Sequence, residues 1–147
     1  FSLGGDVVYG GRDEQDNPWK LRIHDKDERL LGLVASMDAT GAVATSGVTK
    51  RQGTYQGTAW HHIIDPRTGK PATTDIMQVS VACGDAVAAD VLAKISVIVG
   101  SSQAFDVLKK HGAQGGLMQY RSKNNELKQA FFGTTVTDMK TPQVQYA

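Results

Sequence analysis

The middle of the chain carries apolar residues at helical spacing. Between residues 85 and 99 they stand at positions i, i+4, i+8 and i+11, and they are Val87, Val91, Ile95 and Ile98. This stripe predicts a helix. Asp85 is a favoured N-cap residue, and Gly100 is expected to end the helix. A second helix is predicted over 102–111.

The second helix has its own start and stop signals. Ser102 is expected to cap it and Gly112 to end it. Phe105 and Leu108 fall on one face at a spacing of three residues, so both are expected to face the core.

Strand patterns lie on both sides of the two helices. The predicted strands are 19–24, 30–36, 42–45, 79–83, 117–120 and 127–132. Strands at both ends with two helices between them indicate an α+β fold, with a mixed or antiparallel sheet packed against the helices.

The connections between these strands are also predicted. A turn at 38–41 is expected to pair the second and third strands, and a turn at 123–125 to make a hairpin of the last two. The charged run 25–29 indicates a solvated loop, and the polar, glycine-bearing segment 47–57 a mobile one.

Composition is that of one globular domain over residues 1–147. A hydrophobic content of 40% suffices for one core. The net charge of +1 gives no electrostatic reason to expect nucleic acid or a membrane surface as a partner. Cys83 stands alone in an apolar strand, where it is expected to be a small buried hydrophobe.

Residues 61–71 read HHIIDPRTGKP and gather ring nitrogens, a carboxylate, a guanidinium and a hydroxyl around one turn. Pro66 and Gly69 favour a tight turn, so these polar groups are expected to be held in a fixed arrangement and not on a flexible loop. Arg67 has the fork geometry that binds anions, although it could equally brace Asp65 across the turn. The segment therefore predicts a ligand-binding loop, with an ordinary polar turn as the alternative.

Several blocks occur in the order found in one protein family. They are Gly4-Gly5-Asp6, Trp19, Ala44-Thr45-Ser46-Gly47, the 61–71 loop, Ser80-Val81, and Ala89-Asp90-Val91-Leu92-Ala93 leading to Gly100. With these blocks the chain resembles the C-terminal half of the ApbE family, the FAD:protein FMN transferases. Family members are longer, so the resemblance implies an N-terminal half or a second chain that completes the site.

The resemblance implies cleavage of the FAD pyrophosphate, transfer of FMN to a threonine or serine hydroxyl of an acceptor protein, and release of AMP. The resemblance makes His62 the catalytic candidate, which would contact the pyrophosphate or assist proton transfer. The residues expected to bind the flavin nucleotide are Gly4, Gly5, Ser46, Gly47, His62, Arg67 and Thr68. It also implies a periplasmic or cell-surface location, with a membrane anchor in the full-length form.

By the same resemblance Asp90 is the candidate Mg²⁺ ligand. The family has a threonine four residues later, where this chain has Lys94. An Asp–Lys pair at this spacing is also an ordinary helical ion pair, worth about 0.3–0.5 kcal/mol. Lys94 in the metal's place would weaken or abolish Mg²⁺ binding, because an ammonium repels a divalent cation.

Two further functional hypotheses stay open beside an active transferase. One is a flavin-nucleotide binder with impaired catalysis, and the other is a structural fragment that needs a partner chain.

Single residues near these motifs have competing roles as well. His61 is expected to be structural or to face solvent. Asp6 could cap the turn before it or bind nucleotide hydroxyls. Tyr55 and Trp60 are expected in the core, with stacking on a flavin or adenine ring as the alternative.

Overall fold

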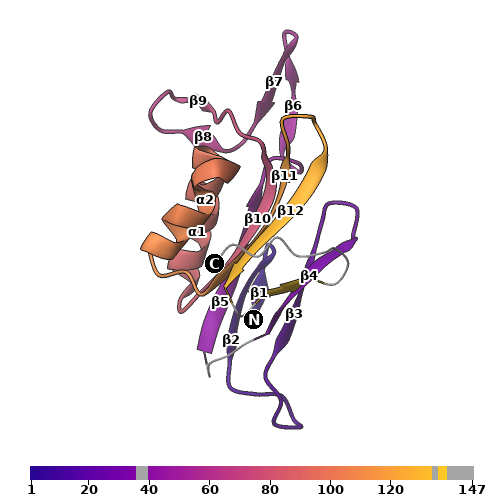
Figure 1. Cartoon of the computed structure of the whole chain (residues 1–147), viewed down its shortest axis with the longest axis vertical. Helices are drawn as coiled ribbons and strands as arrows, with labels where there is room; N and C mark the ends of the chain where they lie inside the picture. The colour runs from indigo at the N-terminus through magenta and orange to yellow at the C-terminus, as the bar shows by residue number, and fades with distance from the viewer. Residues whose placement is uncertain (36–39, 134–135, 139–147) are drawn as a thin grey trace.

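A computed structural model of the chain describes residues 1–35, 40–133 and 136–138. Its main element is a six-stranded sheet in which each strand pairs antiparallel to its neighbours (Figure 1). In spatial order the strands are β1 (Ser2–Leu3), β2 (Asp6–Gly10), β5 (Thr40–Gly47), β10 (Ile76–Cys83), β11 (Gly115–Arg121) and β12 (Leu127–Gly133). Four of the predicted strands lie here, and the predicted hairpin is formed by β11 and β12.

Two helices, α1 (Ala86–Val99) and α2 (Ser101–Lys110), cover one face of this sheet (Figure 1). The predicted α+β class is therefore confirmed. The Asp85 side chain accepts a hydrogen bond from the Ala88 N–H at 2.9 Å, so it caps α1 as predicted.

Cys83 is buried, as predicted, and burial raises the pKa of its thiol. No helix within the described ranges is long and apolar enough to cross a membrane.

The predicted helix is present, but only part of its apolar stripe faces the core: Ile98 packs against the core, whereas Val87 and Val91 are exposed. Val87 is 74% exposed and Val91 is 46% exposed. The buried residues of the helix are Ala89, Leu92, Ala93, Ser96 and Val97. Because α1 is apolar on more than one side, the spacing of the large residues did not identify the buried face. The face that packs on the sheet carries small alanines, which let the helix approach closely.

The start of α2 also differs from the prediction. The helix begins at Ser101, and its N-cap is Gly100 at φ +82°, with no cap from its own side chains. Instead the carboxylate of Asp75 accepts from the Ser101 N–H at 2.8 Å and from the Ser101 hydroxyl. Phe105 and Leu108 are buried as predicted.

The opposite face of the main sheet is covered by a second sheet of three strands. These are β3 (Lys20–His24), β4 (Leu30–Ala35) and β13 (Val136–Asp138). Ile23 and Leu31 pack there against Val43, Leu117 and Phe131 of the main sheet. The three layers are thus helices, main sheet and small sheet.

The predicted pairing of 30–36 with 42–45 is wrong. Strand β4 pairs with β3 and β13, whereas β5 pairs with β2 and β10. The expected turn at 38–41 lies largely outside the described residues. Strand β5 is buried on both faces, which suits the interior of a large sheet better than a two-stranded pairing.

The predicted mobile loop at 47–57 contains a strand. Strand β6 (Gln52–Tyr55) pairs with β7 (Thr58–His61) in a hairpin that projects beyond the main sheet (Figure 1). Gln56 and Gly57 take φ of +49° and +77°, which suits a two-residue hairpin turn. The strand was missed because its residues are polar and show no apolar alternation.

Candidate functional site

The predicted binding loop lies at the end of the molecule from which the β6–β7 hairpin projects (Figure 1). Strand β8 (Ile64–Asp65) pairs with β9 (Lys70–Pro71), and residues 66–69 make the turn between them. The N–H groups of Thr68 and Gly69 both donate to the Asp65 carbonyl, at 3.1 and 2.8 Å. Gly69 takes φ +67°, as expected for the residue that lets this turn close.

Asp65 organises the loop. It is only 7% exposed, and its carboxylate accepts from the backbone N–H, Nε and Nη2 of Arg67, each at 2.9 Å. Of the two roles predicted for Arg67, the structure therefore shows the brace. The Arg67 side chain remains 69% exposed and keeps unused N–H donors, so bracing does not remove its capacity to bind an anion.

The Arg67 side chain and backbone N–H hold the pKa of Asp65 below its ordinary value. The pair therefore stabilises the fold above the ordinary carboxyl pKa of 3.8, and the stabilisation is lost as pH falls through the lowered pKa. We expect Arg67→Met to raise the pKa of Asp65, as measured by NMR titration of the carboxyl carbon. The advantage of the wild type over Arg67→Met in free energy of unfolding should shrink below pH 3.8.

Arg22→Met is the matched control for this titration, because Arg22 is exposed on β3 in the second sheet. It should leave the pKa of Asp65 unchanged. An Asp65 pKa that is the same in the wild type and in Arg67→Met would contradict the brace.

The two adjacent histidines have different surroundings. The Nδ1 atom of His61 accepts from the Ile63 N–H at 3.3 Å, which leaves Nε2 to donate to the Ala72 carbonyl at 2.9 Å. His61 thus has the structural role predicted for it. His62 is exposed; its N–H donates to the Arg51 carbonyl at 3.1 Å, and its Nδ1 lies 3.3 Å from the same oxygen.

Thr68 helps to hold the turn. Its hydroxyl donates to the Asp65 carbonyl at 3.4 Å and accepts from the Lys70 N–H at 3.2 Å. The side chain is exposed, so the same hydroxyl lies at the surface of the loop.

Gly4 and Gly5 form the turn between β1 and β2, with φ of +65° and +103°. A Cβ at either position would meet nothing within 4 Å, so the backbone conformation is what requires glycine here. The Asp6 carboxylate accepts from the Thr45 N–H at 3.1 Å. Asp6 therefore ties β2 to β5, a role different from the two predicted for it.

Ser46 and Gly47 end strand β5. Ser46 is buried, and a Cβ on Gly47 would lie 2.5 Å from the Met77 carbonyl oxygen. The close approach that the structure shows at Gly47 is therefore between β5 and β10. The expected approach to a dinucleotide stays a prediction.

Asp90 and Lys94 form an ion pair on α1, which is the alternative to a metal site that their i, i+4 spacing predicted. Both side chains are partly exposed. Among the residues that the structure describes, no three His, Cys, Asp or Glu side chains come together as a metal-binding group. A lone carboxylate already paired with an ammonium does not fit Mg²⁺, which needs open oxygen ligands.

The predicted residues His62, Arg67 and Thr68 lie on one loop, each with its side chain exposed. Gly4 and Gly5 stand at the edge of the main sheet, and Asp90 stands on α1.

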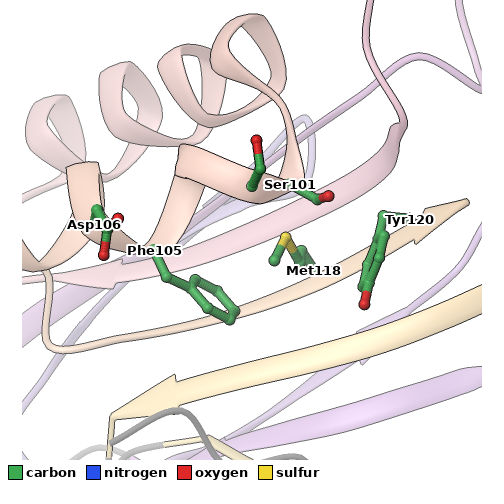
Figure 2. Close-up of a pocket in the computed structure, with 6 residues that line it drawn as sticks. Ser101, Phe105, Asp106, Met118 and Tyr120 are labelled. Atoms are coloured by element: carbon green, nitrogen blue, oxygen red, sulfur yellow. The ribbon is translucent and has the colours of Figure 1, made fainter. Parts of the chain in front are cut away.

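A pocket of about 280 Å³ lies between α2 and β11 (Figure 2). It is lined by Ser101, Ser102, Phe105, Asp106, Met118 and Tyr120. None of the predicted site residues lines it. Sequence reasoning missed the pocket because its walls come from a helix and a strand that only the fold brings together.

Comparison with known proteins agrees with the motifs. The sequence profile of the ApbE family matches residues 1–117. The FAD:protein FMN transferase of Treponema pallidum is 34% identical over 129 residues, which are 84% of this chain and 34% of that protein. That of Klebsiella pneumoniae is 30% identical over 112 residues, 76% of this chain and 32% of that protein. The chain thus spans about a third of the length of these relatives.

Solved structures give the same picture. The ApbE protein of Thermotoga maritima superposes with a TM-score of 0.69 at 28% identity, covering 85% of this chain and 40% of its own. The flavin transferase ApbE from Vibrio cholerae gives 0.66 at 25% identity, covering 88% of this chain and 40% of its own. Both comparisons extend over most of the described fold.

Proposed function

The chain belongs to the ApbE family, and on that premise we propose that it supplies the pyrophosphate-binding part of an FAD:protein FMN transferase. The reaction breaks the P–O–P linkage of FAD. The phosphorus of the FMN half forms a new bond to a threonine or serine hydroxyl of an acceptor protein, and AMP leaves. The observation that carries this proposal is the 61–71 loop, in which Asp65 fixes an exposed Arg67 and His62 is exposed on the same loop.

The loop residues have separate tasks in this proposal. Asp65 orients the Arg67 guanidinium, and the free N–H donors of Arg67 bind phosphate oxygens of FAD. Charge neutralisation and alignment are the main needs of such a transfer. The exposed ring of His62 takes the proton of the acceptor hydroxyl or returns it to the leaving AMP. The Thr68 hydroxyl donates to a phosphate oxygen in exchange for its 3.4 Å hydrogen bond to the Asp65 carbonyl. Gly4, Gly5, Ser46 and Gly47 contact the nucleotide.

Mg²⁺ enters the proposal only as a test, because the donors of this chain do not fit it. When bound, the ion would neutralise phosphate charge. The Asp90–Lys94 pair instead favours a second candidate function, a flavin-nucleotide binder whose transfer chemistry is impaired.

Calorimetric titration of the chain with FAD, with Mg²⁺ and then with chelator, tests both candidates. Binding is expected in the first buffer, and Arg67→Met should weaken it about tenfold, whereas Arg22→Met should not. Binding that is lost with chelator would support the transferase, with Asp90 as a metal ligand despite Lys94, and chelator-insensitive binding would support the impaired binder. Absence of binding in both buffers would contradict both candidates and leave the structural fragment that needs a partner chain.

The Lys94→Thr variant tests whether Asp90 on α1 is a metal ligand or only the partner of a helical ion pair. Threonine removes the ammonium from Asp90 and adds an oxygen one turn along the helix, so Mg²⁺ affinity should rise if Asp90 is a metal ligand. Lys110→Thr at the end of α2 is the control. Unchanged Mg²⁺ affinity in Lys94→Thr would reject the placement of the metal at Asp90.

A further inference from the structure

The β6–β7 hairpin is an arm with no core of its own. Gly53 and His61 are only partly buried, and the other residues of its two strands are exposed. The hairpin projects away from the three layers at the top of the view (Figure 1). An isolated two-stranded hairpin is marginally stable in water, so an added strand would be favourable here.

One face of this arm is aromatic. Gly53 is paired with Trp60, and Tyr55 with Thr58, which places Trp60 and Tyr55 on the same face. A Cβ on Gly53 would lie 3.0 Å from the Trp60 ring, so the indole lies across the glycine. Tyr55 is 69% exposed and Trp60 44%, contrary to the core positions predicted for them.

The arm and the loop carry a surplus of positive charge. Residues 45–72 contain four basic side chains and one acidic one, although the whole chain has a net charge of only +1. The acidic residue, Asp65, is paired with Arg67. Within the described ranges the remaining three have no ion-pair partner, and they are Lys50, Arg51 and Lys70.

Among the described residues β6 pairs only with β7, which leaves its outer edge without a neighbouring strand. The His62 N–H donates to the Arg51 carbonyl, so the hydrogen-bonded positions of the hairpin alternate from there along β6. Gly53 and Tyr55 then direct their backbone groups toward β7, whereas Thr54 directs its N–H and C=O away from it. Thr54 is exposed.

We propose that the β6 edge docks the acceptor protein, which adds an extended acidic segment to the hairpin as a third strand. The proposal rests on the proposed transfer of FMN to a protein hydroxyl. Backbone hydrogen bonds along β6 would hold the segment, Lys50 and Arg51 would pair with its carboxylates, and Tyr55 and Trp60 would contact its side chains. The Arg51 carbonyl that accepts from the His62 N–H points toward the β7 side, so a segment on the outer edge of β6 lies across that strand from the His62 backbone, about 10 Å away.

The test uses a short fluorescent peptide of alternating Glu and Thr, compared with one of alternating Lys and Thr. The wild type should bind the acidic peptide, with an affinity that falls as salt rises. Thr54→Pro removes one outward N–H of β6 and should weaken binding about tenfold. Ala59→Pro makes the same change on the outward edge of β7 and should bind like the wild type.

The charged residues are tested with the double variant Lys50→Ala, Arg51→Ala, which should weaken binding and flatten its salt dependence. The matched control is Lys20→Ala, Lys110→Ala, which removes two exposed lysines elsewhere. Thermal unfolding of every variant checks that the fold is intact.

Three results would overturn the docking proposal: equal binding of both peptides, unchanged binding in Thr54→Pro, or equal loss in both proline variants. Binding of anionic lipid vesicles or single-stranded DNA that depends on Lys50 and Arg51 but not on the Thr54 N–H would assign the arm to those partners instead. FAD titration of the same proteins keeps the two proposals apart. FAD binding without peptide binding rejects the docking edge alone, and peptide binding without FAD binding rejects the proposed transferase alone.

Discussion

Replacing Leu92 by alanine is expected to lower the free energy of unfolding by about 2–5 kcal/mol. Leu92 lies in the middle of α1, is almost fully buried, and belongs to the core between the helices and the main sheet. Truncation removes buried methyl groups and leaves a cavity in a close-packed layer. Urea unfolding followed by circular dichroism measures the change.

Val91→Ala is the matched control, because Val91 is the adjacent residue of the same helix and is 46% exposed. Its effect should lie within about 0.5 kcal/mol of zero. A larger loss in Val91→Ala than in Leu92→Ala would show that the apolar stripe, and not the alanine-containing face, packs on the sheet.

Gly47→Ala is expected to destabilise the fold by about 1–3 kcal/mol. The added Cβ would lie 2.5 Å from the Met77 carbonyl oxygen, a backbone atom of the neighbouring central strand, so β5 and β10 must move apart. The same denaturant experiment measures the loss. FAD titration of this variant shows whether nucleotide binding falls together with stability.

Gly84→Ala is the control for this substitution. A Cβ on Gly84 would meet nothing within 4 Å, and its φ is ordinary, so stability should be nearly unchanged. Equal stability of Gly47→Ala and the wild type would mean that the close approach of the two strands is not what requires glycine.

The sequence predicted those elements that carry strong local signals. The buried strand at 79–83, the Asp85 cap and the tight turn around Gly69 each follow from a few neighbouring residues, and the structure contains them. The family motifs located the 61–71 loop before any geometry was known. They could not choose between anion binding and bracing for Arg67, because that depends on where the Asp65 carboxylate points.

What the sequence did not predict depends on contacts between distant segments. The partner of β5 is chosen by burial on both of its faces, which a turn signal at 38–41 does not reveal. The side chain that accepts hydrogen bonds at the start of α2 belongs to Asp75, 26 residues before Ser101. The β6–β7 hairpin has no apolar alternation, since neither of its faces packs in a core.

The bonds of His61 have a mechanical consequence. His61 ends the β6–β7 hairpin, and its Nε2 binds the carbonyl of Ala72, while the Ala72 N–H donates to Ile63. These two hydrogen bonds hold the two ends of the 61–71 loop together and form a narrow junction, the neck, between the hairpin and the loop. In the proposed complex, a force on the hairpin would meet these two hydrogen bonds before it reached Asp65 and Arg67. Docking of the acceptor and binding of the nucleotide would then be mechanically separate, although the residues proposed for them are nearly consecutive.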